Sequence, residues 1–69
     1  MKTNDKITII PSIALSEMRM DRLVGRRGKV TKIIYKKDRR VYGCWVLLDG
    51  APFLDNHEWF IPFDSFTEG

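Results

Sequence analysis

Two neighbouring segments of strand-forming residues, separated by a short charged stretch, constrain the fold of this chain more than any other feature. Residues 29–35 read KVTKIIY and residues 41–48 read VYGCWVLL, so both are rich in β-branched and aromatic side chains. The segment between them, residues 36–40 (KKDRR), is wholly polar and is typical of a hairpin loop. The sequence therefore predicts a long antiparallel hairpin in the middle of an all-β fold.

Shorter segments on either side predict three further strands. Residues 6–10 (KITII) end at Pro11, which cannot donate a ladder hydrogen bond. Residues 57–61 (HEWFI) form a fourth strand, residues 62–65 a single 3₁₀ turn, and residues 66–67 a short fifth strand. Between the first two strands, the irregular apolar spacing of residues 13–23 predicts a long loop with one turn of helix at most.

Five short strands in 69 residues favour a small antiparallel barrel, because closure removes the sheet edges that a flat meander exposes. A chain of this length makes a single domain, which we expect to span residues 1–69. It buries only about 60% of the surface of its unfolded form. No deep active-site cleft is therefore expected.

Two stretches resemble known β-barrel modules. The stretch HEWFIPFDSF is similar to the end of SH3-like domains, where an aromatic-bearing strand runs into Ile-Pro and a 3₁₀ turn. The stretch LVGRRGKVTKII resembles the KOW motif of ribosomal and transcription-elongation proteins. The resemblance implies an all-β, five-stranded SH3-like antiparallel barrel, with a long loop after the first strand and a 3₁₀ turn before the last. Binding of nucleic acid or a nucleoprotein follows from it by analogy.

Positive charge is concentrated in one part of the chain. Ten of the twelve Lys and Arg residues lie between residues 19 and 40, whereas residues 41–69 hold five acidic residues and no Lys or Arg. Such a segment can contact phosphates, or it can keep the protein soluble and pair with the acidic half. A continuous stripe along residues 29–35 requires a bulge, because Lys29 and Lys32 differ in strand parity. The candidate phosphate contacts are Arg26, Arg27, Lys29, Lys32, Lys36, Lys37, Arg39 and Arg40.

The aromatic residues are expected mainly in the core, with Trp45 at the centre of the most apolar strand. Replacement of Trp45 by alanine is then expected to unfold the domain. Both faces of residues 41–48 are apolar, so one of them must be partly exposed or covered by the long N-terminal loop. Trp59 and Phe60 point to opposite faces, and one of them is expected at the surface. Tyr35 and Tyr42 are candidates for stacking on bases.

Two other binding functions are compatible with the same residues. A groove between the long loop and the 3₁₀ turn, with Trp59, Pro62 and Phe63 on its walls, would bind a peptide or a partner subunit. An exposed apolar face would instead dock the domain on a larger assembly. Exposed aromatic residues beside the basic hairpin favour nucleic acid, whereas exposed aromatic residues beside Glu58 and Asp64 favour a basic or proline-rich peptide. An aromatic cage for methylated lysine is a further alternative.

No motif indicates catalysis. One cysteine, Cys44, excludes an internal disulfide, and with the single histidine, His57, it cannot complete a four-ligand zinc site. We therefore expect a non-enzymatic protein without cofactor or metal. A lone cysteine suits a reducing compartment, and no segment approaches the ~20 apolar residues of a membrane span. The expected location is cytoplasmic, without a signal peptide and without a membrane partner.

Overall fold

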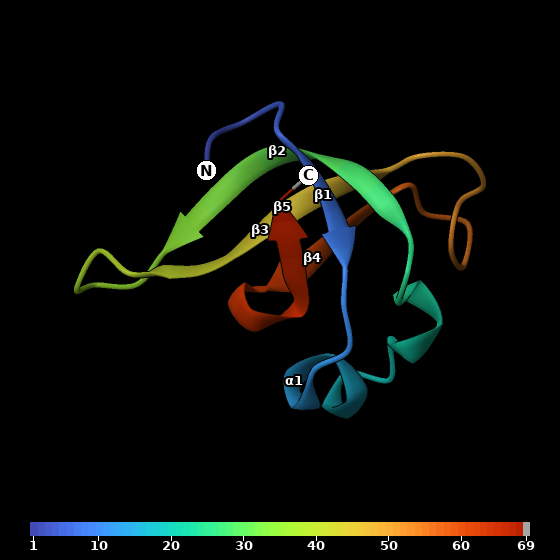
Figure 1. The fold of residues 1–69 in the computed structure, drawn as a ribbon, viewed down its shortest axis with the longest axis horizontal. Helices are drawn as coiled ribbons and strands as arrows, with labels where there is room; N and C mark the ends of the chain where they lie inside the picture. Colours follow the sequence, from blue (N-terminus) through green and yellow to red (C-terminus); the bar gives the residue numbers. More distant parts are fainter. Residues whose placement is uncertain (69) are drawn as a thin grey trace.

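The computed structural model describes residues 1–68 and shows a five-stranded antiparallel sheet in the order β4-β3-β2-β1-β5 (Figure 1). The strands are β1 (Lys6–Ile9), β2 (Arg27–Tyr35), β3 (Val41–Leu48), β4 (Glu58–Pro62) and β5 (Phe66–Glu68). Three short helical elements are α1 (Ile13–Glu17) and the 3₁₀ helices η1 (Asp21–Leu23) and η2 (Phe63–Ser65). The predicted all-β class is confirmed, and every predicted strand is present with its ends displaced by two residues or fewer.

The predicted closed barrel is wrong. Among the described residues, β4 pairs only with β3 and β5 pairs only with β1, so these two strands form the two edges of an open sheet. The reason is that β5 is three residues long and all three pair with β1. The chain passes from β4 through η2 into β5, which lies beside β1 at the opposite edge of the sheet from β4. The strand order and the all-β content are compatible with an SH3-like fold.

The predicted central hairpin is confirmed. Strands β2 and β3 pair antiparallel from Gly28 and Leu48 to Tyr35 and Val41. Residues 36–40 form the tip, which projects away from the body of the molecule (Figure 1). The backbone N–H of Arg39 donates to the carbonyl of Lys36 at 2.9 Å, and the N–H of Lys36 donates to the carbonyl of Arg40 at 2.7 Å. These two hydrogen bonds close the turn.

The core is aliphatic, and the expectation that most aromatic side chains lie in it is wrong. Trp45 is 38% exposed, because the alternation of β3 turns Cys44, Val46 and Leu48 inward and Trp45 outward. Phe53, Trp59 and Phe66 pack only at the margin of the core. The ten buried apolar residues are Ile7, Ile9, Leu15, Met20, Leu23, Val30, Cys44, Val46, Leu48 and Ile61.

The connection between β1 and β2 is more ordered than predicted. It contains both α1 and η1 instead of one turn of helix. The Ser12 side chain caps α1, because its hydroxyl accepts a hydrogen bond from the Leu15 N–H at 2.9 Å. The same hydroxyl lies 2.5 Å from the hydroxyl of buried Ser65. Leu15, Met20 and Leu23 are buried, so the segment is fixed by the core as well as by the cap.

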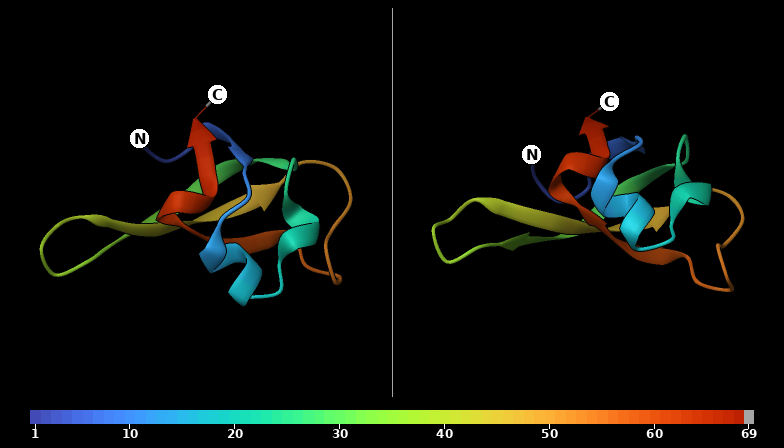
Figure 2. Two further views of the ribbon diagram at one scale, coloured as in Figure 1. Left: turned by 60° about the horizontal axis from the view of Figure 1, so that its bottom comes forward. Right: turned by 90° about the horizontal axis from the view of Figure 1, so that it is seen from below.

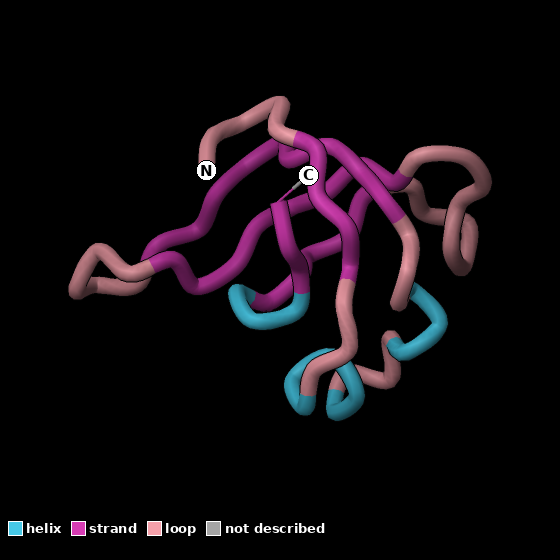
Figure 3. Tube along the Cα trace, in the orientation of Figure 1, coloured by secondary structure: helices cyan, strands magenta, loops and turns pink. Residues whose placement is uncertain are grey.

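The small elements gather on one side of the central hairpin. The helical segments lie in the lower half of the view in Figure 3, and β1 and β5 lie on the same side of the β2–β3 hairpin (Figure 2). Their buried side chains belong to one cluster with the inward residues of β2, β3 and β4. The opposite side of β3 carries the exposed residues Trp45 and Leu47. Within residues 1–68, no helix has the length and apolar character needed to cross a membrane.

Candidate nucleic-acid interface

A β-bulge at Thr31 places two lysines on one face of β2. Lys29 pairs with Leu47 and Lys32 pairs with Trp45, so four residues on β2 match three on β3. Because the extra residue reverses the alternation, Lys29 and Lys32 point to the same side of the sheet. The bulge that a continuous stripe requires is therefore present. Lys32 is exposed and Lys29 is half-buried.

Three aromatic rings form a row beside these lysines. The ring centroids of Tyr42 and Phe60 lie 5.4 Å apart, and those of Phe60 and Trp45 lie 5.8 Å apart in an edge-to-face arrangement. Phe60 is the cross-strand partner of Trp45 on β4. Tyr42 is 53% exposed and Trp45 is 38% exposed. We call Tyr42, Phe60 and Trp45 the aromatic row.

Gly43 makes room for the central ring of the aromatic row. A Cβ atom built on Gly43 would lie 2.5 Å from Cζ of Phe60 and 2.6 Å from the carbonyl oxygen of Ile61. No side chain fits there without displacing the phenyl ring or the β4 backbone. A second register shift, between Ile34 and Tyr35, accompanies this close approach.

Trp45 and Phe60 share one face of the sheet with the two lysines. A shallow hollow of about 350 Å³ lies between Thr31, Lys32, Trp45 and Glu58. The carboxylate of Glu58 accepts a hydrogen bond from the Thr31 hydroxyl at 2.5 Å, which holds this acid over the bulge. We call this surface of β2, β3 and β4 the outer face, and its residues are Lys29, Lys32, Trp45, Leu47 and Phe60. Tyr42 adjoins the outer face through its contact with Phe60, beside the groove that α1 lines.

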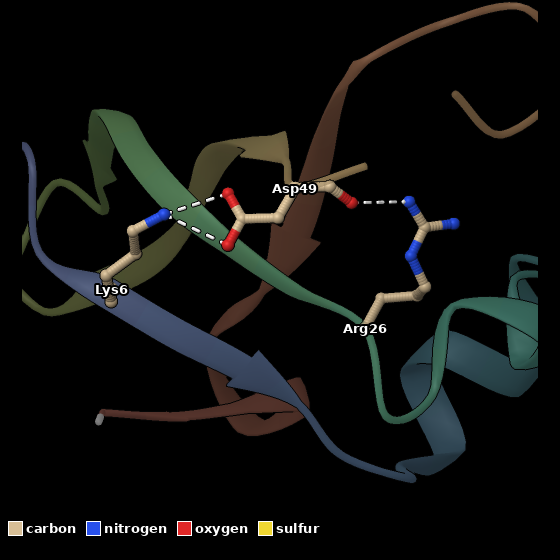
Figure 4. A network of polar contacts seen from close by, with 3 residues as sticks. All are labelled: Lys6, Arg26 and Asp49. Carbon is tan, nitrogen blue, oxygen red and sulfur yellow. Dashed lines mark hydrogen bonds and ion pairs between the residues drawn. The ribbon is translucent and has the colours of Figure 1, made fainter. Parts of the chain in front are cut away.

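Arg26 has a structural role. Its guanidinium donates to the carbonyl of Asp49 at 2.9 Å and to the carbonyl of Ala51, so it ties the start of β2 to the loop after β3 (Figure 4). The carboxylate of Asp49 in turn accepts from the ammonium of Lys6 at 2.8 Å (Figure 4). Arg27 is exposed and pairs with Thr8 of β1, and its backbone carbonyl accepts a hydrogen bond from the Asp49 N–H at 2.9 Å. Gly25, just before this segment, has a φ of +88°, in the left-handed region that favours glycine.

The hairpin tip carries four exposed basic side chains, from Lys36, Lys37, Arg39 and Arg40. Asp38 organises the tip, because its carboxylate accepts from the Arg40 N–H at 3.1 Å and lies 3.2 Å from Nε of Arg40. Arg39 has a φ of +70°, in the left-handed region that favours glycine. The tip therefore keeps a charged side chain at a position where the backbone is strained.

Of the remaining aromatic candidates, Tyr35 is 57% exposed and lies outside the aromatic row. It pairs with Val41, and this pair is the last one before the hairpin tip. Trp59 and Phe60 point to opposite faces, as predicted. The Trp59 indole lies on the inner side, where its ring packs 5.2 Å from Phe53 and its N–H donates to the carbonyl of Asn56 at 2.9 Å. Trp59 is thus turned away from the predicted groove.

Pro62 lines a groove, and Phe63 lines a hollow beside it. A groove of about 520 Å³ runs between α1 and β4, and a neighbouring hollow reaches η2 and Lys36. Glu17 and Asp64 bring negative charge to this region. The residues lining the groove itself are Ala14, Glu17, Met18, Tyr42, Phe60 and Pro62.

Cys44 offers no nucleophile at neutral pH. Its side chain is fully buried in β3, and burial raises the pKa of the thiol from its ordinary value of 9.0 to about 11. No cluster of three or more His, Cys, Asp or Glu side chains suited to a metal ion occurs within residues 1–68.

Sequence reasoning missed Trp45 as a surface residue and left open which of Trp59 and Phe60 lies on its face of the sheet. The alternation of residues 41–48 placed Trp45 opposite Cys44 and Val46, but both alternating sets are apolar, and the larger ring was assigned to the core. The pairing register between β3 and β4 resolves the ambiguity, because it places Trp45 beside Phe60. That register becomes visible only once the strands are aligned.

Comparisons with protein-family models, with curated proteins and with solved structures find no match to this chain. Its function is therefore inferred from its own residues and their geometry.

Proposed function

We propose that this protein is a non-enzymatic nucleic-acid-binding module of SH3-like type, which contacts its ligand through the outer face and the hairpin tip. The observation that carries the proposal is the bulge at Thr31, which aligns Lys29 and Lys32 beside the aromatic row. Exposed aromatic residues beside basic residues favour nucleic acid. Glu58 shares the hollow of Trp45 and Lys32, and Asp64 that of Tyr42 and Lys36, and these acids favour the second candidate function below. The resemblance of residues 23–34 to a KOW motif supports the same function.

The charges of this surface suit a polyanion. Lysine and arginine side chains that neutralise phosphates release condensed counterions, and this release supplies most of the non-specific affinity for nucleic acid. Lys29 and Lys32 lie on the sheet, and four more basic side chains lie on the projecting tip. Arg27 adds a further exposed charge at the start of β2. Arg26 is left out of the interface, because its guanidinium binds Asp49 and Ala51.

The test is a titration with a fluorescent probe that contains both forms of nucleic acid, a DNA duplex with a single-stranded tail, at several salt concentrations. We expect log K to fall with log salt by about 0.7–0.9 per phosphate contact. Replacing Lys29 and Lys32 together by glutamine should weaken binding and reduce the slope by about the equivalent of two contacts.

The matched control replaces Arg19 and Arg22 by glutamine. Both are exposed on the segment around η1, away from the outer face, and their loss changes the net charge by the same amount. If both double variants lose affinity equally, binding reflects net charge alone and the proposed interface is wrong. Absence of any association at low salt would reject nucleic-acid binding altogether.

The groove between α1 and β4 favours a second candidate function, the binding of a basic or proline-rich peptide. Its walls are apolar, with Met18 on one side and Pro62 on the other, and Glu17 supplies a negative charge. Tyr42 and Phe60 belong both to this groove and to the aromatic row, so substitutions there cannot separate the two functions.

Substitutions outside the shared residues do separate the functions. The probe is a peptide of alternating proline and arginine, followed by NMR chemical-shift changes in the labelled protein. Peptide binding predicts shifts at Met18 and Pro62, and a loss of affinity in Met18→Ala but not in the Lys29 and Lys32 variant. Shifts that appear only around the hairpin tip, or none at all, would reject the groove as a binding site.

A further inference from the structure

The aromatic row is not required to complete the core. Ten buried residues without an aromatic ring form the interior, and no buried side-chain nitrogen or oxygen within the described chain lacks a partner. Trp45 and Tyr42 nevertheless leave 38% and 53% of their surface in water, and each contacts Phe60. Single exposed apolar residues are ordinary, but a contiguous patch of aromatic rings marks an interaction surface.

The rings are also held in place before any ligand arrives. Phe60 stands between the two outer rings, tilted by 36° to Tyr42 and by 67° to Trp45. Because Gly43 has no side chain, the Phe60 ring packs directly against the β3 backbone, and no other side chain fits between them. Side chains that are already ordered lose little conformational entropy on binding, which favours a planar ligand placed against Tyr42 and Trp45.

Positive charge lies next to these rings on the neighbouring strand. Lys32 is the direct cross-strand neighbour of Trp45, about 5 Å away between strand axes. Lys36, at the start of the hairpin tip, lines the same hollow as Tyr42. Each exposed ring thus has a lysine beside it, together with one acid, Glu58 at Trp45 and Asp64 at Tyr42, and the two pairs follow one another along the β2–β3 hairpin.

A duplex cannot use both features. Its bases are stacked on one another and present only their edges in grooves about 6 or 12 Å wide, so the lysines would meet phosphates while the ring faces stayed in water. An unpaired base has a free π-face that stacks on an aromatic side chain whatever its identity. We propose, building on the proposed function, that the outer face binds single-stranded nucleic acid, with bases stacked on Trp45 and Tyr42 and phosphates at Lys32 and Lys36.

The experiment compares an oligothymidylate of about 12 nucleotides with a blunt duplex of equal length, which carries twice as many phosphates. We expect the single strand to bind at least tenfold more tightly at moderate salt. Trp45→Ala should weaken single-strand binding by roughly tenfold and leave the salt slope unchanged, because it removes stacking and no charge. Trp45→Phe should retain most of the affinity.

Leu54→Ala is the control, because Leu54 is 70% exposed and lies beside Arg19 and Arg22, away from both lysines and the aromatic row; its affinity should equal that of the parent. Tyr42→Ala repeats the test if Trp45→Ala fails to fold. Equal affinity for both probes, with neither aromatic substitution having an effect, would overturn the single-strand inference while leaving nucleic-acid binding through Lys29 and Lys32 intact. Failure of both probes to bind would reject the proposed function as well.

Discussion

Strand β3 has two apolar faces, of which one is buried and the other is exposed. Cys44, Val46 and Leu48 are buried on the inner face, whereas Trp45 and Leu47 on the outer face are 38% and 40% exposed. Hydrophobicity alone does not distinguish these faces. The difference arises because the other elements of residues 1–68 contribute their buried side chains to the core on one side of the sheet and leave the other side exposed.

The comparison shows that the interior selects for shape as well as for apolar character. The inner face meets side chains from β1, α1 and η1 and is filled by branched aliphatic residues. The outer face meets solvent and carries aromatic rings together with lysines, which can contact both water and a ligand. Burial in the core accounts for the residues of the inner face, whereas the outer face is the surface through which we propose that a ligand binds.

The largest expected effect on the free energy of unfolding comes from truncating one side chain on each face of the sheet to alanine. Ile61→Ala removes a fully buried side chain of β4 and should cost about 2–5 kcal/mol, comparable to the ~3–5 kcal/mol that a core of this size supplies. Trp45→Ala, on the outer face, should cost only about 1–2 kcal/mol, because solvent fills the space left by an exposed ring. This corrects the expectation that loss of Trp45 unfolds the domain.

Urea denaturation of the two variants measures the difference. A Trp45→Ala protein that is as unstable as Ile61→Ala would show that the outer face contributes to folding as much as the core does, and would remove the distinction between the faces.

The pH dependence of the free energy of unfolding tests whether the Cys44 thiol on the inner face is buried. Burial raises its pKa in the folded protein from 9.0 to about 11, so the folded state keeps a proton that the unfolded state loses. This stabilisation is present in full below pH 9 and is lost as pH rises through 11, a change of about 2–3 kcal/mol.

The free energy of unfolding of the parent should therefore fall more steeply between pH 9 and 11 than that of Cys44→Ala. The alanine variant retains the titration of the tyrosines and lysines and so serves as the control. Parallel pH profiles for the two proteins would show that the thiol is accessible to water and that the inner face is open at Cys44.

The substitution Gly43→Ala tests the packing of the Phe60 ring against Gly43. The added methyl group would meet Phe60 and the carbonyl of Ile61, and the shifts needed to admit it should cost about 1–3 kcal/mol. Near-ultraviolet circular dichroism should change, because Phe60 loses its contacts with Tyr42 and Trp45. Gly50→Ala is a useful contrast, since its destabilisation comes from a φ of +81° and its added methyl meets no atom within 4 Å. An unchanged aromatic spectrum in Gly43→Ala would contradict the assigned role.

The smallest effect is expected at the hairpin tip. Arg39→Gly relieves the strain of a positive φ and should raise stability by about 0.5–1 kcal/mol. The same change removes a positive charge, so affinity for an oligonucleotide should fall and the salt slope should decrease by about one contact. Lys37→Ala, at the neighbouring turn position, should lower affinity without the gain in stability. Loss of stability in Arg39→Gly would show that the arginine side chain supports the hairpin instead of serving a ligand.

Local features of the fold followed from residue chemistry close to them in sequence. The β-branched runs, the polar stretch of residues 36–40 and Gly25 with its positive φ each specify a conformation through neighbouring side chains and sterics. The need for a bulge between Lys29 and Lys32 also followed from strand parity, and the structure has the bulge at Thr31. The 3₁₀ turn before β5 was likewise predicted within one residue.

Features that depend on which strands meet did not follow in the same way. Both alternating sets of β3 are apolar, so only the positions of β1, α1 and η1 decide that Val46 is inside and Trp45 outside. Sheet closure depends on whether β4 and β5 reach each other, which no local pattern encodes. By itself the sequence determined the strands, their turns and the concentration of positive charge, because these depend on contacts within a few residues. Only the tertiary structure decided the faces, the open sheet and the meeting of Lys32 with Trp45 and Phe60, because pairing register joins residues far apart in the chain.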